Sequence, residues 1–180
     1  MKDAAELAEV RLPDAAGNET RLGDLWSERP AVLVWLRHYG CPFCRQYIAR
    51  LAERYGEFES RDIALVAIGM GDPREATDFL GGRDVPFPLL VDGGQETYRK
   101  LELTRSFLGS NGPKVWFKAL QAAVFEGNKM SVAKQDQSQL GGAMAVAPGG
   151  QIKYLHRARN SADNAPIDDL LAALTAETAS

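Results

Sequence analysis

The stretch Ala31-Val-Leu-Val-Trp-Leu-Arg-His-Tyr-Gly-Cys-Pro-Phe-Cys44 runs from an apolar segment into a pair of cysteines. Residues 31–36 show no alternation of polar and apolar side chains, which is typical of a strand buried on both faces. Beyond the cysteines, one set of apolar residues recurs with the spacing of a helix face: Phe43, Tyr47, Leu51 and Tyr55. The stretch therefore predicts a buried strand that leads into a helix from Pro42 to about Glu59, with both cysteines at the junction.

A second apolar run, Ile63–Ile68, follows that helix and also lacks polar alternation. A buried strand, a helix and a second buried strand in this order form a βαβ unit. Such a unit places its two strands parallel, with a right-handed crossover. The sequence therefore predicts an α/β fold around a sheet that is covered on both faces.

Turn residues and periodicity predict the remaining elements. Before the first strand we expect a hairpin around the turn 13–18 and a short helical turn at Gly23–Trp26. After the βαβ unit the expected elements are a helix at Pro73–Leu80 with Asp72 as its N-cap, an edge strand at Val85–Val91, a short helix at Glu96–Leu101, a hairpin of Ala143–Ala147 with Ile152–Leu155, and a final helix from Pro166 to Leu174. The predicted sheet is therefore mixed, with helices on its flanks.

The span from Thr104 to Gly142 fits no strand. Residues 113–125 predict a helix, whereas residues 128–139 are polar and typical of a loop. A long irregular insert is uncommon in a compact domain, and it is either functional or a surface excursion. Because no interdomain linker is recognisable, we expect one domain over residues 1–180 with an insert at about 104–142.

Composition excludes several classes of function. The 180 residues carry a net charge of -3, which gives no reason to expect nucleic acid or an anionic membrane as a partner. No apolar stretch approaches the ~20 residues that cross a bilayer, and the acidic N-terminus does not resemble a signal peptide. Two cysteines are too few for a secreted disulfide scaffold. We therefore expect a cytoplasmic protein whose cysteines are catalytic rather than structural.

The Cys-Pro-Phe-Cys spacing suits redox chemistry. Pro42 fits the first helical position, which places Cys41 at the N-cap and Cys44 in the first turn. Free backbone N–H groups and the positive end of the helix stabilise a thiolate there. Lowering a thiol pKa from about 8.5 to about 7 raises the thiolate at neutral pH from a few per cent to half. The pair is also close enough in sequence to close a disulfide, as in thioredoxin-like redox motifs.

Three basic residues near the cysteines are candidates for supporting the thiolate: Arg37, His38 and Arg45. Two alternatives to redox chemistry are a pair of reduced, buried cysteines and a zinc site. Zinc is disfavoured because only two histidines, His38 and His156, remain as further ligands of the usual kind, so we expect no metal and no bound cofactor. His156 is expected to be a surface or loop histidine with a satisfied hydrogen bond rather than a catalytic one.

The chain resembles the peroxiredoxin-like proteins of the AhpC/TSA type, which have a thioredoxin fold. The segments that carry the resemblance are Leu36-Arg-His-Tyr-Gly-Cys-Pro-Phe-Cys-Arg45, Val66-Ala-Ile-Gly69, Phe87-Pro-Leu-Leu-Val-Asp92, Leu140-Gly-Gly142, Ala147-Pro-Gly-Gly-Gln-Ile-Lys-Tyr154 and the tail 156–166. The resemblance implies a central mixed sheet flanked by helices and a thiol-based activity, either peroxide reduction or disulfide exchange.

The resemblance leaves the order of the two cysteines open. Typical peroxiredoxins have a threonine three residues before the peroxidatic cysteine, which aligns Cys44 with that cysteine and Cys41 with the threonine. The thioredoxin pattern instead makes Cys41, expected to be the more exposed N-cap thiol, the nucleophile. The peroxiredoxin pattern covers more of the chain and favours Cys44. The arginine that usually supports the peroxide is not evident, since Leu140-Gly-Gly142 occupies its neighbourhood.

The leading hypothesis is a thiol-based oxidoreductase that reduces hydroperoxides through a Cys41–Cys44 dithiol–disulfide cycle. Its reductant is expected to be an external dithiol of the thioredoxin or glutathione type, and a homodimer is compatible with the sequence. One alternative is a thiol–disulfide reductase without peroxidase activity. Another is a non-enzymatic redox sensor or partner-binding module that uses the insert at 104–142 as its contact surface.

Overall fold

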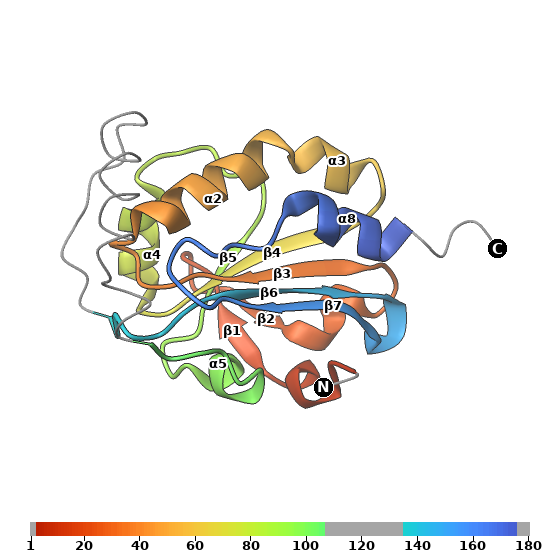
Figure 1. Ribbon diagram of the computed structural model, residues 1–180, viewed down its shortest axis with the longest axis horizontal. Coiled ribbons are helices and arrows are strands. Elements are labelled where there is room, and N and C mark those ends of the chain that lie inside the picture. Colours follow the sequence, from red (N-terminus) through yellow and green to blue (C-terminus); the bar gives the residue numbers. More distant parts are fainter. Residues whose placement is uncertain (1–2, 107–134, 176–180) are drawn as a thin grey trace.

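The computed structural model describes residues 3–106 and 135–175, and its centre is a five-stranded mixed sheet (Figure 1). The strands lie in the order β5-β4-β3-β6-β7, so the first strand of the βαβ unit is central. Their bounds are β3 (Ala31–Trp35), β4 (Ala64–Gly69), β5 (Leu89–Val91), β6 (Gly142–Val146) and β7 (Ile152–Arg157). β3, β4 and β5 are parallel, whereas β6 runs antiparallel to β3 and β7 antiparallel to β6. The predicted mixed sheet is confirmed.

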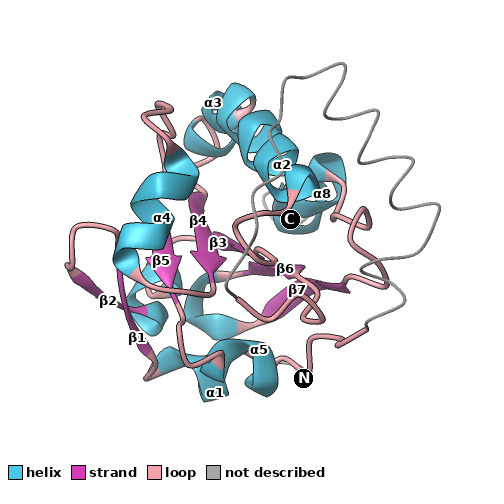
Figure 2. Ribbon diagram, turned by 90° about the vertical axis from the view of Figure 1, so that its left-hand side faces the viewer, coloured by secondary structure: helices cyan, strands magenta, loops and turns pink. Residues whose placement is uncertain are grey.

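Helices cover both faces of this sheet (Figures 1 and 2). One face carries α2 (Pro42–Glu53), α3 (Tyr55–Glu59), α4 (Pro73–Leu80) and α8 (Ile167–Thr175). The other carries α1 (Ala5–Ala8), the 3₁₀ helix η1 (Leu22–Trp26), α5 (Glu96–Lys100) and the hairpin of β1 (Arg11–Pro13) with β2 (Glu19–Arg21). The layers explain why β3 shows no polar alternation, because Val32 and Val34 enter one core cluster whereas Leu33 and Trp35 enter the other.

Two predicted elements differ from the observed ones. The helix expected from Pro42 to about Glu59 is divided at Arg54, whose φ of -103° and ψ of 10° leave the helical range. The side chain of Arg54 instead forms ion pairs with Glu57 and with Asp168 of α8. The strand expected over 85–91 begins only at Leu89, since the prolines before it cannot donate ladder hydrogen bonds. Its predicted edge position is confirmed.

Among residues 3–106 and 135–175, the other expected elements are present within one or two residues of their predicted bounds. Asp72 caps α4 as expected, and its carboxylate and that of Glu75 form a reciprocal capping box. The β6–β7 hairpin follows a close approach to β3, where a Cβ on Gly141 would lie 2.2 Å from the carbonyl oxygen of Trp35. Only glycine fits at that point, which gives a structural reason for the Gly-Gly pair before β6.

The insert meets the domain through its two ends. Arg105 and Gln139 form an isolated antiparallel bridge, and the helix expected at residues 113–125 lies outside the described residues. Within the described part of the chain, none of the helices has the length and apolar character needed to span a bilayer.

Candidate active site

The cysteines lie where β3 passes into α2, at the carboxyl edge of the parallel strands. Cys41 is the N-cap of α2 with extended backbone dihedrals (φ -78°, ψ 119°), Pro42 is the first helical residue and Cys44 is the third. Both thiols are free. Cys41 is 1% exposed and Cys44 3%, because most of the surrounding loop from Arg37 to Phe43 is itself buried. The expectation that Cys41 is the more exposed thiol is therefore wrong.

Arg37 is the cation that contacts the thiols. Its Nη1 donates to Cys41 Sγ at 3.2 Å and its backbone N–H donates to Cys44 Sγ at 3.3 Å. The residue is only 5% exposed, and the described residues bring no carboxylate into ion-pair contact with it. A buried guanidinium needs a negative partner, since an unpaired buried charge is strongly unfavourable. A thiolate on Cys41 supplies that partner.

The hydrogen bond between the two sulfurs decides which one carries the charge. The Cys44 thiol donates to the Cys41 sulfur, which lowers the pKa of Cys41 to about 6; the Arg37 charge adds to the effect and burial opposes it. The same hydrogen bond, together with burial and the negative charge on Cys41, raises the pKa of Cys44 well above its ordinary value. At neutral pH the anion therefore lies on Cys41 and the proton on Cys44.

His38 does not supply a second cation. Burial, followed by repulsion from Arg37, lowers the pKa of His38 to about 4, so the ring is neutral at pH 7. Its buried Nδ1 has no hydrogen-bond partner among the described residues. The expectation that His38 supports the thiolate as a charged group is therefore wrong.

Arg45 is directed away from the sulfurs. Its guanidinium donates to the carbonyl oxygens of Phe79 at 3.1 Å and of Tyr39 at 3.3 Å, and it stacks over the Phe79 ring at 5.0 Å. It acts on the thiols only through the longer-range field of its charge. Of the three predicted supporting residues, the structure brings only Arg37 into hydrogen-bond contact with a sulfur.

Two tyrosines contact the ends of β3 and β4 next to the thiol loop, and neither of them was identified from the sequence. Tyr98 Oη donates to the carbonyl oxygens of Leu36 at 2.7 Å and of Ile68 at 3.2 Å, which ties together the ends of β3 and β4. The Tyr39 ring lies against Gly69, where an added Cβ would come within 2.3 Å of Tyr39 Oη. The Val66–Gly69 segment thus ends in glycine because an aromatic ring occupies the place of a side chain.

The described end of the insert reaches the thiol loop. The carbonyl oxygen of Gln137 accepts a hydrogen bond from Arg37 Nη2 at 2.9 Å. The side-chain Oε1 of Gln135 accepts from the backbone N–H of Tyr39 at 3.2 Å. No sequence signal pointed to these contacts, because residues 128–139 show only the polar composition of a loop.

The surroundings offer few groups to a cofactor or metal. Across residues 3–106 and 135–175, no three His, Cys, Asp or Glu side chains gather at positions that could hold a metal ion. A cavity of about 310 Å³ lies beside the thiol loop, and its charged lining consists of Asp72 and Glu75. Those two carboxylates already accept backbone N–H groups in the α4 capping box. The reactive groups of the site are therefore the two thiols.

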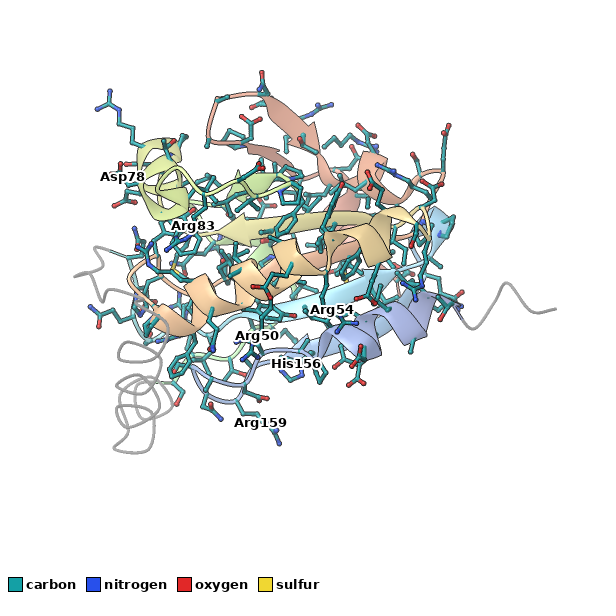
Figure 3. All side chains as sticks on the ribbon, turned by 90° about the horizontal axis from the view of Figure 1, so that it is seen from above. Arg50, Arg54, Asp78, Arg83, His156 and Arg159 are labelled. Atoms are coloured by element: carbon teal, nitrogen blue, oxygen red, sulfur yellow. The ribbon has the colours of Figure 1, made fainter. Side chains whose placement is uncertain are left out.

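His156 behaves as the sequence predicts for a satisfied histidine, although it lies within β7. Its Nε2 is 2.9 Å from the carbonyl oxygen of Asp163, whose carboxylate also pairs with the exposed Arg159. Figure 3 shows His156 and Arg159 on the same side of the molecule, with Arg159 extending outward. Together these contacts hold the segment that leads from β7 to α8.

The chain is similar to proteins of one known family. A family model described as AhpC/TSA antioxidant enzyme matches residues 50–160, more than half of the chain. The chain is 31% identical to thioredoxin-like protein AAED1, chloroplastic, of Arabidopsis thaliana, over 96% of this chain and 73% of that protein. It is 29% identical to peroxiredoxin-like 2C of Homo sapiens, over 93% of this chain and 78% of that protein.

Among solved structures, peroxidoxin BcpB of Mycobacterium tuberculosis is similar in fold. It matches with a TM-score of 0.71 at 21% identity, over 98% of each chain. The range matched by the family model begins after Cys44, so the roles of the two thiols rest on the geometry described above.

Proposed function

Since the chain belongs to the AhpC/TSA antioxidant enzyme family, we propose that its Cys41–Cys44 pair reduces hydroperoxides in a dithiol–disulfide cycle. Membership of this family makes the protein a peroxiredoxin-like thiol oxidoreductase on a thioredoxin fold. The observation that carries the proposal is the buried Cys41 sulfur, which accepts a hydrogen bond from Arg37 Nη1 at 3.2 Å.

In the first step the Cys41 thiolate attacks the terminal oxygen of the hydroperoxide. An S–O bond forms, the O–O bond breaks, and the leaving alkoxide takes up a proton to become an alcohol. Cys41 is thereby oxidised to a sulfenic acid. We assign the attack to Cys41 because its sulfur accepts a hydrogen bond from the Arg37 guanidinium, and because the pKa of Cys41 is lowered and that of Cys44 is raised. The peroxiredoxin pattern in the sequence favours Cys44 instead.

In the second step the Cys44 sulfur attacks the Cys41 sulfur. The S–S bond forms, the sulfenic S–O bond breaks, and the hydroxyl group leaves as water with the proton of the Cys44 thiol. Arg37 contacts both sulfurs, its Nη1 at 3.2 Å from Cys41 Sγ and its backbone N–H donating to Cys44 Sγ at 3.3 Å, which holds the two thiols in one site. An external dithiol of the thioredoxin or glutathione type then reduces the disulfide, a step suited to a reducing compartment such as the cytoplasm.

Burial favours a hydroperoxide over a protein disulfide as the oxidising substrate. With Cys41 1% and Cys44 3% exposed, a small peroxide has easier access to the thiolate than a folded protein with its own surface disulfide. The second candidate function, thiol–disulfide reduction, draws its support from the N-cap position of Cys41, where helix-end N–H groups also favour a thiolate.

The test compares wild type, Cys41→Ser and Cys44→Ser in turnover of a hydroperoxide with a thioredoxin system, and in reduction of insulin. We expect the wild type to consume peroxide over many turnovers and to reduce insulin poorly. Cys41→Ser should be inactive, and Cys44→Ser should form a sulfenic acid on Cys41 without sustained turnover. Insulin reduction without peroxide consumption would replace the proposal with the disulfide reductase, and full activity of either mutant would exclude the dithiol cycle.

A further inference from the structure

The two ends of the insert form a short stem, defined here as residues 104–106 and 135–140. Ser106 N–H donates to the Ser138 carbonyl at 2.8 Å, and Leu140 N–H donates to the Thr104 carbonyl at 2.9 Å. The Gln139 side chain, in a residue that is 2% exposed, donates to three backbone carbonyls around this pairing. The stem is therefore an ordered part of the domain, although its sequence is that of a loop.

This stem holds the loop that carries Cys41 at two points. The Gln137 carbonyl binds the Arg37 guanidinium, and the Gln135 side chain binds the backbone of Tyr39. The guanidinium is a rigid planar fork, so fixing Nη2 on a carbonyl also fixes the direction of Nη1. Nη1 is the atom that donates to Cys41 Sγ. The position of the Gln137 carbonyl thus determines how Arg37 meets the thiolate.

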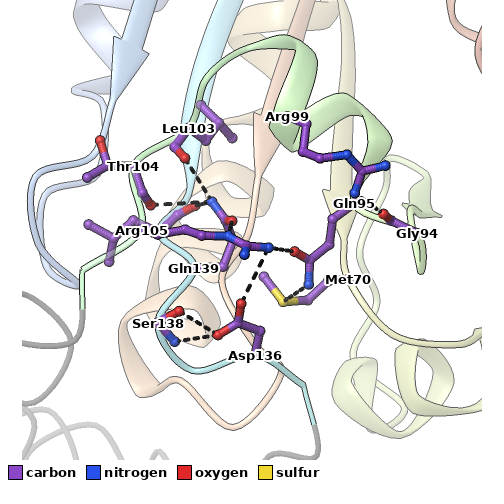
Figure 4. Close-up of polar contacts among 11 residues, drawn as sticks. Met70, Gly94, Gln95, Arg99, Leu103, Thr104, Arg105, Asp136, Ser138 and Gln139 are labelled. Atoms are coloured by element: carbon purple, nitrogen blue, oxygen red, sulfur yellow. Dashed lines mark hydrogen bonds and ion pairs between the residues drawn. The ribbon is translucent and has the colours of Figure 1, made fainter.

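Arg105 connects the stem to its neighbours (Figure 4). Its Nε donates to Gln139 Oε1 at 2.9 Å, its Nη2 donates to Gln95 Oε1 at 2.8 Å, and the same Nη2 lies 3.5 Å from Asp136 Oδ2. Asp136 Oδ1 in turn accepts hydrogen bonds from the backbone N–H and the hydroxyl of Ser138, at 2.9 and 2.6 Å. Gln137 lies between these two residues, so the turn that Arg105 holds in place is the turn that presents the Gln137 carbonyl.

We propose that Arg105 is a positioning residue for the Cys41 thiolate, acting through the Asp136–Ser138 turn and the Gln137 carbonyl on Arg37. The inference rests on the proposed function of Cys41 as the nucleophile. Arg105 itself does not touch either sulfur. The charged and titratable groups that act on Cys41 are Cys44 and Arg37, with Arg45 at longer range, and the neutral His38 lies beside Arg37.

The test measures the rate of iodoacetamide alkylation at Cys41 as a function of pH, with the modified sulfur located by fragmentation mass spectrometry. The variants are Arg105→Gln, Asp136→Asn and Arg105→Lys, and the matched control is Arg29→Gln. Arg29 forms a surface ion pair with Asp62 beside the opposite end of β3. Arg105 has a side chain that is 57% exposed, so its replacement should leave the fold intact, which circular dichroism checks.

Arg105→Gln should raise the alkylation midpoint of Cys41 from about 6 by about half a pKa unit, because the thiolate loses part of its charge-assisted hydrogen bond. The thiolate fraction at pH 6 then falls about 2-fold, and the alkylation rate falls by less, since the more basic thiolate is also more nucleophilic. At pH 9.5, where the thiol is ionised in every variant, the rate should be equal to that of wild type or slightly higher. Asp136→Asn should shift the midpoint in the same direction. Arg105→Lys should recover only part of the shift, because an ammonium group lacks the fork that serves three acceptors.

Two outcomes would overturn this inference. The first is that Arg105→Gln and Asp136→Asn show the same pH midpoint of Cys41 alkylation as the wild type and the Arg29→Gln control. The other is an equal change of rate at every pH, which would mean altered access to Cys41 rather than altered ionisation. A wild-type midpoint near the ordinary thiol value of about 8.5 would instead defeat the proposed function of Cys41, so the two failures are distinguishable.

Discussion

Replacing Arg37 with glutamine should move the Cys41 titration to higher pH. The guanidinium nitrogen lies 3.2 Å from Cys41 Sγ, a distance at which two unit charges interact by about 5 kcal/mol at an effective dielectric constant of about 20. Glutamine is neutral, and the hydrogen bond from Cys44, which contributes most to the lowered pKa, remains. A close opposite charge is worth about 1–3 pKa units, and we expect about 2 here. The alkylation midpoint should therefore rise from about 6 to about 8.

The alkylation rates of Arg37→Gln and of the wild type, plotted against pH, should cross. At pH 6 the thiolate fraction falls from about one half to about 1%, whereas the intrinsic nucleophilicity of the more basic thiolate rises about 6- to 10-fold. The net result is a loss of about 5- to 8-fold at pH 6 and a gain of about 6- to 10-fold at pH 9. Arg50→Gln, on the exposed face of the same helix, is the control and should follow the wild-type curve. A variant curve that is uniformly lower, or one that keeps the wild-type midpoint, would refute the role assigned to Arg37.

Three further predictions concern the frame around the thiols. Tyr98→Phe removes the hydroxyl donor of the Leu36 carbonyl, whereas the Ile68 carbonyl keeps the Leu36 N–H as a donor. Urea unfolding should show a loss of about 1–3 kcal/mol. Gly69→Ala should be strongly destabilising, because its Cβ would lie 2.3 Å from Tyr39 Oη. Gly56→Ala is the control: a Cβ there meets nothing within 4 Å, so this helix substitution should raise the unfolding midpoint. Equal changes in stability at both glycines would contradict the packing argument. Burial, then repulsion from Arg37, lowers the pKa of His38 to about 4, so between pH 6.5 and 4 the unfolded chain takes up a proton that the native ring does not, and stability falls as the pH falls. His38→Gln should show a shallower fall over this range in chemical denaturation, and an unchanged pH dependence would show that His38 titrates normally.

The elements that hold the thiols could be predicted from sequence because their signals are local. The apolar run of β3, the proline at the start of α2 and the cap at Asp72 each act on neighbouring residues, so the strand–helix junction was placed within a residue or two. The break at Arg54 carries no such local signal, and one of its side-chain partners, Asp168, lies more than a hundred residues away in the sequence.

The electrostatics of the site were only partly predictable for the same reason. Sequence proximity nominated Arg37, His38 and Arg45 equally, and only the tertiary packing directs one of them to the sulfur. The burial of Cys41 and the contacts of Gln137 depend on chain segments that carry no periodic signal. Spacing thus identifies the thiols, whereas their ionisation depends on the fold around them.

The buried guanidinium of Arg37 has a further consequence: we expect the enclosure of the site to depend on the oxidation state of the two cysteines. In the reduced protein the cation faces an anionic sulfur, and the closed loop is electrically balanced. A Cys41–Cys44 disulfide carries no charge, so oxidation leaves a desolvated cation with only dipolar partners such as the Gln137 carbonyl. The energy of that unbalanced charge favours hydration of Arg37 and therefore local unfolding of its loop. Oxidation by the peroxide would in this way expose the disulfide to the solvent, where a bulky reductant can reach it. Reduction would restore the Cys41 thiolate, and the loop would close again around Arg37.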